Sequence, residues 1–198
     1  MCCKDKPVFA TVMIELSYSN IAKKQIRKAM HSLSCRVAKL SLEVYGDYSS
    51  NLGISWIFND YIKSISKQQG ALKLFNVKLS FKQIFRIIIS GSHVDKILLA
   101  DCYILEGSLC RRPIGISKLT NIEFRNIRGN PFVSFTNPQT YKSILTSLSL
   151  CPCVSTLQSI QLLECKITPK DIRSIKKDPN FNNIIITLQN RGRTTVIG

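Results

Sequence analysis

The sequence is short of acidic residues and contains no long hydrophobic run. Only 12 Asp and Glu oppose 28 Lys and Arg, which gives a formal net charge of +16. This imbalance favours an acidic partner, such as nucleic acid, an anionic membrane surface or an acidic protein. The apolar stretches at 87–89 and 184–186 are far shorter than the roughly 20 residues that span a bilayer. Because the start, Met-Cys-Cys-Lys-Asp-Lys, also lacks the apolar segment of a secretory signal, we expect a cytoplasmic protein.

Residues that commonly carry catalysis are scarce as well. There are two histidines, and neither a Walker loop nor a Gly-x-Gly-x-x-Gly motif occurs. His93 and Asp95 share a face of the strand that we expect there, but two such residues do not define an active site. Cys151 and Cys153 lack the second pair that a zinc site needs. The sequence therefore predicts no enzyme, no cofactor, no metal and no small-molecule substrate.

What the sequence does contain is an internal repeat. Residues 94–104 read Val-Asp-Lys-Ile-Leu-Leu-Ala-Asp-Cys-Tyr-Ile, and residues 157–167 read Leu-Gln-Ser-Ile-Gln-Leu-Leu-Glu-Cys-Lys-Ile. Both match the pattern L-x-x-L-x-L-x-x-(N/C)-x-L. Strict alternation of apolar residues indicates a strand with one buried face. Cys102 and Cys165 occupy the ninth position, where the chain leaves the strand, so we expect small buried thiols rather than reactive ones.

Weaker copies occur at 37–45, 69–79 and 119–127, with degenerate ones around 14–16 and 184–186. The residues taken as equivalent at the fourth position are Ile14, Leu40, Leu72, Ile97, Ile122, Ile160 and Ile184. Most of the steps between them fall in the range of roughly 20 to 29 residues that is typical of such repeats.

This pattern resembles that of leucine-rich-repeat proteins, and the cysteine at the ninth position resembles the ribonuclease-inhibitor-like subclass. The resemblance implies an α/β horseshoe-shaped solenoid, with a parallel sheet on the concave side and helices on the convex side. It brings no catalytic residues, because the signature is structural, and it implies a protein-binding scaffold. An ordinary α/β domain is the alternative fold.

Most connections between the strands have helical patterns. We expect helices over 20–33, 55–66, 80–91, 141–150 and from 168 onward. Ser80 and Gln83 form a predicted capping box, and Thr168-Pro169 is a predicted helix start. As domains we expect a tail at 1–7, about seven divergent repeats over 8–190 with an insertion near 128–140, and a tail or stub of a further repeat at 191–198.

The residues that flank the buried strand positions would line the concave face and contact a protein partner. The predicted contact residues are Lys73, Phe75, Lys96, Leu98, Glu123, Arg125, Gln161, Leu163 and Ile185. Exposed apolar groups inside a polar rim are typical of protein-binding surfaces. The alternative is that this face binds nothing or is covered by flanking loops.

A second candidate surface is basic and helical. Lys23, Lys24, Arg27 and Lys28 lie on the outward side of the first expected helix. These residues predict, as an alternative function, a basic adaptor that binds nucleic acid or an anionic membrane. A merely solvated helix face explains the same charges.

Overall fold

The computed structural model describes residues 9–15, 23–46, 57, 59–61, 69–80, 83, 94–105, 121–125, 145–146, 148, 156–165 and 167–198. The amino-terminal elements are β1 (Phe9–Glu15), α1 (Lys23–Ser34), β2 (Lys39–Tyr45), β3 (Gln69–Phe75) and β4 (Lys78–Ser80). The central strands are β5 (Val94–Ala100), β6 (Tyr103–Leu105) and β7 (Asn121–Arg125). The carboxyl-terminal elements are β8 (Ser159–Leu163), α5 (Pro169–Ile175), the 3₁₀ turn η2 (Pro179–Phe181), β9 (Ile185–Asn190) and β10 (Arg193–Ile197).

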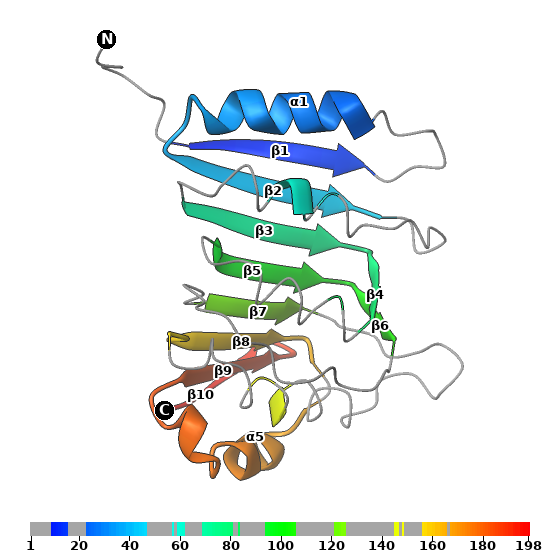
Figure 1. Ribbon diagram of the computed structural model, residues 1–198. Helices are drawn as coiled ribbons and strands as arrows, with labels where there is room; N and C mark the ends of the chain where they lie inside the picture. Colours follow the sequence, from blue (N-terminus) through cyan, green and yellow to red (C-terminus); the bar gives the residue numbers. More distant parts are fainter. Residues whose placement is uncertain are drawn as a thin grey trace.

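The protein is an α/β structure built on one sheet of eight strands, in the order β1-β2-β3-β5-β7-β8-β9-β10. Every neighbouring pair from β1 to β9 is parallel. Figure 1 shows these strands stacked from β1 at the top to β9 near the bottom, all pointing the same way. Strands β4 and β6 pair in a small second sheet beside the ends of β3 and β5. Among the described residues, no helix is long and apolar enough to cross a bilayer.

Alternating apolar residues form the core on one face of the sheet. In β2, Leu40, Leu42 and Val44 are fully buried, and their counterparts on the other strands are aligned with them. Met30 of α1 and Ile172 of α5 join the same core. Full burial of one aliphatic side chain contributes about 1.5–3 kcal/mol, so this row of residues is a main source of stability. The predicted strand alternation is thus confirmed.

The repeat frame needs a correction of two residues at both ends. Leu72, Ile97, Ile122 and Ile160 are in register as expected. Leu72, however, pairs with Leu42 rather than Leu40. Likewise the aligned residues on the terminal strands are Val12 and Ile186, not Ile14 and Ile184. A shift of two residues keeps every side chain on its face, so alternation alone could not reveal the error.

The expected helices are found where the structure describes them. Helix α1 begins at Lys23, and α5 has the predicted Thr168 cap, completed by Asp171 into a capping box. Ser80 and Gln83 form their reciprocal contact, with the Ser80 amide donating to Gln83 Oε1 over 2.8 Å. Residues 57, 59–61, 83, 145–146 and 148 are helical. The rest of those segments, the tail at 1–7 and the insertion near 128–140 lie outside the described residues.

The carboxyl terminus differs from the expected tail or repeat stub at 191–198. Residues 193–197 form β10, which pairs antiparallel with β9, whereas another repeat would add a parallel strand. A two-residue turn joins the strands, and both of its residues, Arg191 and Gly192, have positive φ. Such a turn matches the right-handed twist of a hairpin. The sheet therefore ends in a hairpin.

Candidate protein-binding face

The face of the sheet opposite the core, which we call the outer face, is built from three aligned rows of side chains. The first row contains Thr11, Ser41, Ala71, Lys96, Asn121, Ser159 and Ile185. The second contains Met13, Glu43, Lys73, Leu98, Glu123, Gln161 and Thr187, and the third contains Glu15, Tyr45, Phe75, Ala100, Arg125, Leu163 and Gln189. Parallel pairing holds each row at the strand spacing of about 4.8 Å. The nine predicted contact residues all fall in these rows.

Over β2 and β3, the outer face carries a polar and aromatic network. Lys73 Nζ lies 2.7 Å from Glu43 Oε1, and the Tyr45 hydroxyl donates to Glu43 Oε2 over 2.9 Å. The rings of Tyr45 and Phe75 stack with centroids 4.6 Å apart and planes 7° apart. The hydrogen bond from Lys73 holds the pKa of Glu43 below its usual value, and the bond to Glu43 raises the pKa of Tyr45. The carboxylate of Glu43 thus holds both the ammonium group of Lys73 and the ring of Tyr45 in place.

The centre of the outer face is largely closed to solvent. Lys96 reaches across to Glu123, with Nζ 3.7 Å from Oε2, and Glu123 is only 6% exposed. Leu98 is 8% exposed, and Ala71 and Ala100 are buried. The expectation of an exposed apolar contact at Leu98 is therefore corrected, because this side chain is nearly closed to solvent although it lies on the outer face. Replacing it would test stability more than binding.

Toward β9 the outer face is accessible again. Gln161 is exposed, Leu163 is half-buried, and Ile185 is 50% exposed. Val196 of β10, which lies opposite Thr187, is 63% exposed on the same face. The side chain of Arg125 lies outside the described residues. Ile185 and Val196 therefore form an accessible apolar area at this end of the outer face.

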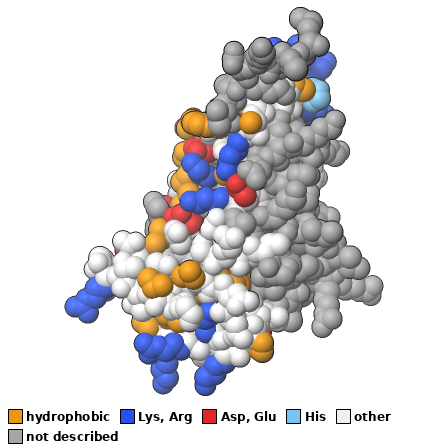
Figure 2. All heavy atoms as spheres, turned by 90° about the vertical axis from the view of Figure 1, so that its left-hand side faces the viewer, with side chains coloured by type: hydrophobic (Ala, Val, Ile, Leu, Met, Phe, Trp, Pro, Cys, Tyr) orange, Lys and Arg blue, Asp and Glu red, His pale blue; other side chains and the backbone are white. Residues whose placement is uncertain are grey.

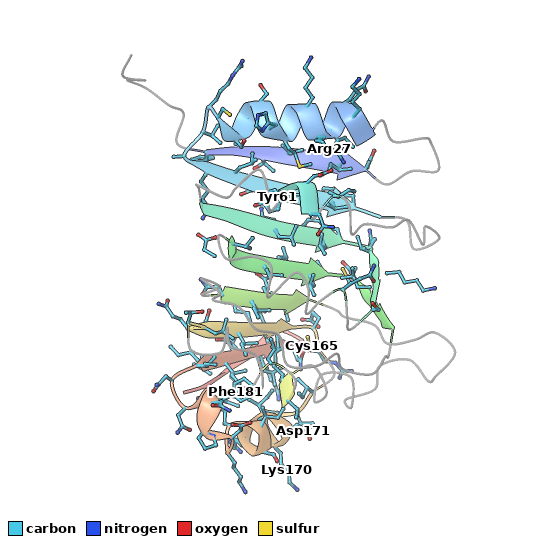
Figure 3. All side chains as sticks on the ribbon, viewed as in Figure 1. Arg27, Tyr61, Cys165, Lys170, Asp171 and Phe181 are labelled. Carbon is cyan, nitrogen blue, oxygen red and sulfur yellow. The ribbon has the colours of Figure 1, made fainter. Side chains whose placement is uncertain are left out.

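The predicted basic face of α1 is partly engaged, because one of its residues forms an ion pair. Arg27, labelled in Figure 3, lies 2.9 Å from the carboxylate of Asp60, although the guanidinium-bearing side chain is 62% exposed. Lys24 and Lys28 are exposed on the same helix. The side chain of Lys23 lies outside the described residues. Two of the four predicted basic residues are thus shown to be accessible without an acidic partner in the described part of the chain.

The two motif cysteines lie in the turns that leave β5 and β8. Cys102 and Cys165 are buried, and each thiol contacts a backbone carbonyl, Cys102 with Leu74 O at 3.4 Å and Cys165 with Leu163 O at 3.3 Å. Burial raises the pKa of the Cys102 thiol to about 12, so it remains protonated and unreactive at neutral pH. In Figure 3, Cys165 lies where β8 ends. These contacts fit the small-residue role that the motif predicts.

The turns also show a feature that the motif does not specify. The residue before the ninth position has positive φ in three repeats, at Asn76, Asp101 and Glu164. In β2 the equivalent position is Gly46, where an added Cβ would lie 2.7 Å from the carbonyl oxygen of Asn76. The turn after β2 therefore lies too close to Asn76 to accept a side chain at Gly46, whereas the turns after β3, β5 and β8 carry a side chain at the equivalent position.

Of the His93–Asp95 pair, the structure describes only Asp95. Asp95 lies 2.7 Å from the ammonium group of Lys39, two strands away. His93 is outside the described residues, and His31 is exposed near the end of α1. Within the described ranges no group of His, Cys, Asp or Glu could hold a metal ion.

Tyr45 and Met13 were not expected on this face, whereas Glu15 and Glu43 were expected to flank the buried strand positions but were not among the nine predicted contact residues. Tyr45 was taken as the ninth residue of its repeat, because the frame of β2 was shifted by two. Alignment of Leu42 with Leu72 would have placed Tyr45 beside Phe75. The sequence feature that could have revealed this alignment is Val44, an apolar residue that continues the alternation of β2.

Comparison with known proteins gives no further lead. No family model, no curated protein and no solved structure matches this chain.

Proposed function

We propose that the chain is a solenoid of the leucine-rich-repeat type that binds a protein partner through the outer face of its sheet, without catalysis. The parallel register supports the solenoid, because successive strands place equivalent residues in rows. Steps of 25 residues separate Leu72, Ile97 and Ile122 along the chain. Cysteine-lined turns after β5 and β8 support the same repeat.

The observation that carries the binding role is the exposed apolar surface at β9 and β10. Ile185 and Val196 are 50% and 63% exposed on the same face, with polar Gln161, Thr187 and Gln189 around them. Burying apolar side chains within a polar rim is how many protein interfaces gain affinity. The partner would therefore place an apolar group over Ile185.

The test begins by identifying partners that copurify with the tagged chain, then measuring Kd on the purified pair by calorimetry. Ile185→Glu and Gln161→Glu should each weaken binding about tenfold or more, since a buried unpaired carboxylate is costly. Ala29→Glu, on the exposed side of α1, is the matched control. The proposed face would be overturned if all three variants bound the partner as tightly as the parent chain does. It would also be overturned if Ala29→Glu weakened binding as much as the other two variants.

The alternative, a basic adaptor for nucleic acid or an anionic membrane, is favoured by a separate observation. Exposed Lys170 and Arg173 lie on α5, Lys177 follows the helix, and Arg191 and Arg193 lie at the nearby hairpin. Figure 2 shows Lys and Arg side chains gathered at this lower end. Binding of this kind would fall steeply with salt. It would also weaken with Lys170→Gln and Arg173→Gln, which the scaffold mechanism would tolerate.

A further inference from the structure

One corner of the outer face differs in chemistry from the rest of this basic protein. At the carboxyl ends of β1 and β2, Met13 lies beside Glu43, and Glu15 lies beside Tyr45. We call these four residues the Tyr45 corner. Met13 is 66% exposed and Glu15 is exposed as well. The corner thus offers carboxylate, thioether and aromatic surface to solvent within a chain of net charge +16.

The ring of Tyr45 is held in a fixed orientation. Phe75 stacks on one side of it at 4.6 Å, which is nearly the spacing of neighbouring strands. The hydroxyl is tied to Glu43, and Glu43 in turn to Lys73. A ring positioned in this way needs little further ordering when a ligand binds to it.

The opposite side of the Tyr45 ring is directed toward β1. The next position in that row is Glu15, in register with Tyr45. A third ring in this row would continue the stack, but the row has a carboxylate there instead. Glu15 forms no ion pair within the described part of the chain. The aromatic face and the carboxylate are therefore next to each other and available to the same ligand.

We propose that the Tyr45 corner binds an arginine side chain of the protein partner, with the guanidinium stacked on Tyr45 and paired with Glu15. A guanidinium is planar, which suits stacking on a ring, and its paired N–H groups match a carboxylate. The thioether of Met13 supplies apolar contact for the arginine methylene groups. This inference rests on the proposed function, because it assigns one contact of that binding face.

Lysine fits the same corner less well. An ammonium group is compact and strongly hydrated, so it gains less from a flat ring and cannot form two parallel bonds to Glu15. The neighbouring Lys73 already satisfies Glu43, which leaves Glu15 as the available acid. The specificity should therefore be for arginine over lysine.

The experiment follows the methionine methyl signals of the full chain by NMR while N-acetyl-arginine amide is added. The chain has three methionines, and Met30, fully buried on α1, is the internal reference for Met13. The Met13 signal should shift in a saturable manner while Met30 stays in place. N-acetyl-citrulline amide, which keeps the shape but not the charge, should bind at least about threefold more weakly. N-acetyl-lysine amide should also bind more weakly than the arginine probe.

Three variants test the residue assignment. Glu15→Gln and Tyr45→Leu should each weaken binding of the arginine probe about threefold, the size of one exposed charge or cation–π contact. Glu164→Gln, an exposed acid after β8, should leave it unchanged. Equal binding of the arginine and citrulline probes, or equal effects of the three variants, would overturn the proposal.

Failure of the arginine site can be told apart from failure of the proposed function. If the arginine probe fails to bind while Ile185→Glu still abolishes partner binding, the arginine contact is wrong and the binding face stands. If the arginine probe binds and the variants have the expected effects while Ile185→Glu does not change partner binding, the arginine site at the Tyr45 corner stands and the proposed contact at Ile185 is wrong.

Discussion

The amino-terminal strands β1–β3 and the carboxyl-terminal unit of α5, η2 and the β9–β10 hairpin belong to one sheet but are held by different polar contacts. The amino-terminal part uses contacts between residues far apart in sequence: Lys73 and Glu43 are 30 residues apart, and Lys39 is joined to Asp95 of the adjoining β5 over 56 residues. In the carboxyl-terminal part most of the side-chain contacts are local, although the Arg191 amide also donates to Glu164 Oε1, 27 residues away.

In that carboxyl-terminal unit, Thr168 and Asp171 cap α5 over a separation of three residues. Lys176 donates to the carbonyl oxygens of Phe181 and Ile184, no more than eight residues away. Burial lowers the pKa of this ammonium group, in keeping with its position over the turn. The difference teaches that local sequence shapes the carboxyl-terminal unit, whereas the amino-terminal face exists only once the sheet has formed.

The largest effect should come from Phe181→Ala. Phe181 is fully buried, and Figure 3 places it between α5 and the hairpin. Its truncation should lower the free energy of unfolding by about 3–5 kcal/mol, measured by urea denaturation. Amide exchange should accelerate most over 167–197 if this unit opens by itself. Phe9→Ala, at a site 72% exposed, is the control and should change stability by less than about 0.5 kcal/mol. Uniform acceleration across β1–β3 would remove the distinction between the two regions.

Tyr61→Phe should have an intermediate effect, in the amino-terminal region. The buried hydroxyl of Tyr61 lies 2.6 Å from the carbonyl oxygen of Leu40 and 2.9 Å from that of Ala71, so it joins β2 to β3. Its loss leaves buried carbonyl groups without this donor, at a cost of about 1–3 kcal/mol in thermal or urea unfolding. Tyr45→Phe removes a hydroxyl from the half-exposed outer face and should cost less. Equal losses of stability for Tyr61→Phe and Tyr45→Phe would show that the Tyr61 hydroxyl does not join β2 to β3.

Glu43→Gln should have the smallest effect and a defined pH dependence. Because Lys73 lowers the pKa of folded Glu43, its ionised form stabilises the native state above the ordinary value of 4.5. That contribution, below about 1 kcal/mol for a pair at the surface, is lost as pH falls through the folded pKa. The stability difference between the parent chain and the variant should therefore shrink in acid. A difference that stays constant from neutral pH to well below 4.5 would contradict the role assigned to the pair.

Local sequence patterns predicted some parts of the structure down to the residues that form them. The Thr168 cap and the Ser80–Gln83 contact involve neighbours three residues apart, so the sequence specifies both partners. Burial of Cys102 and Cys165 followed from their common place in the repeat. The contact residues were harder to predict, because exposure at Leu98 depends on what the adjacent strands place around it.

Sequence by itself determined which residues of each strand belong to the core face, the turns at Cys102 and Cys165, the Thr168 cap and the Ser80–Gln83 contact. Tertiary structure alone decided the two-residue alignment of β1, β2 and β9, the pairing of Tyr45 with Phe75 and the antiparallel direction of β10. The physical reason is the period of two in a strand, which a slip of two residues leaves unchanged. Hydrogen bonds and packing between neighbouring strands select one alignment, and that alignment places Glu15 beside the ring of Tyr45.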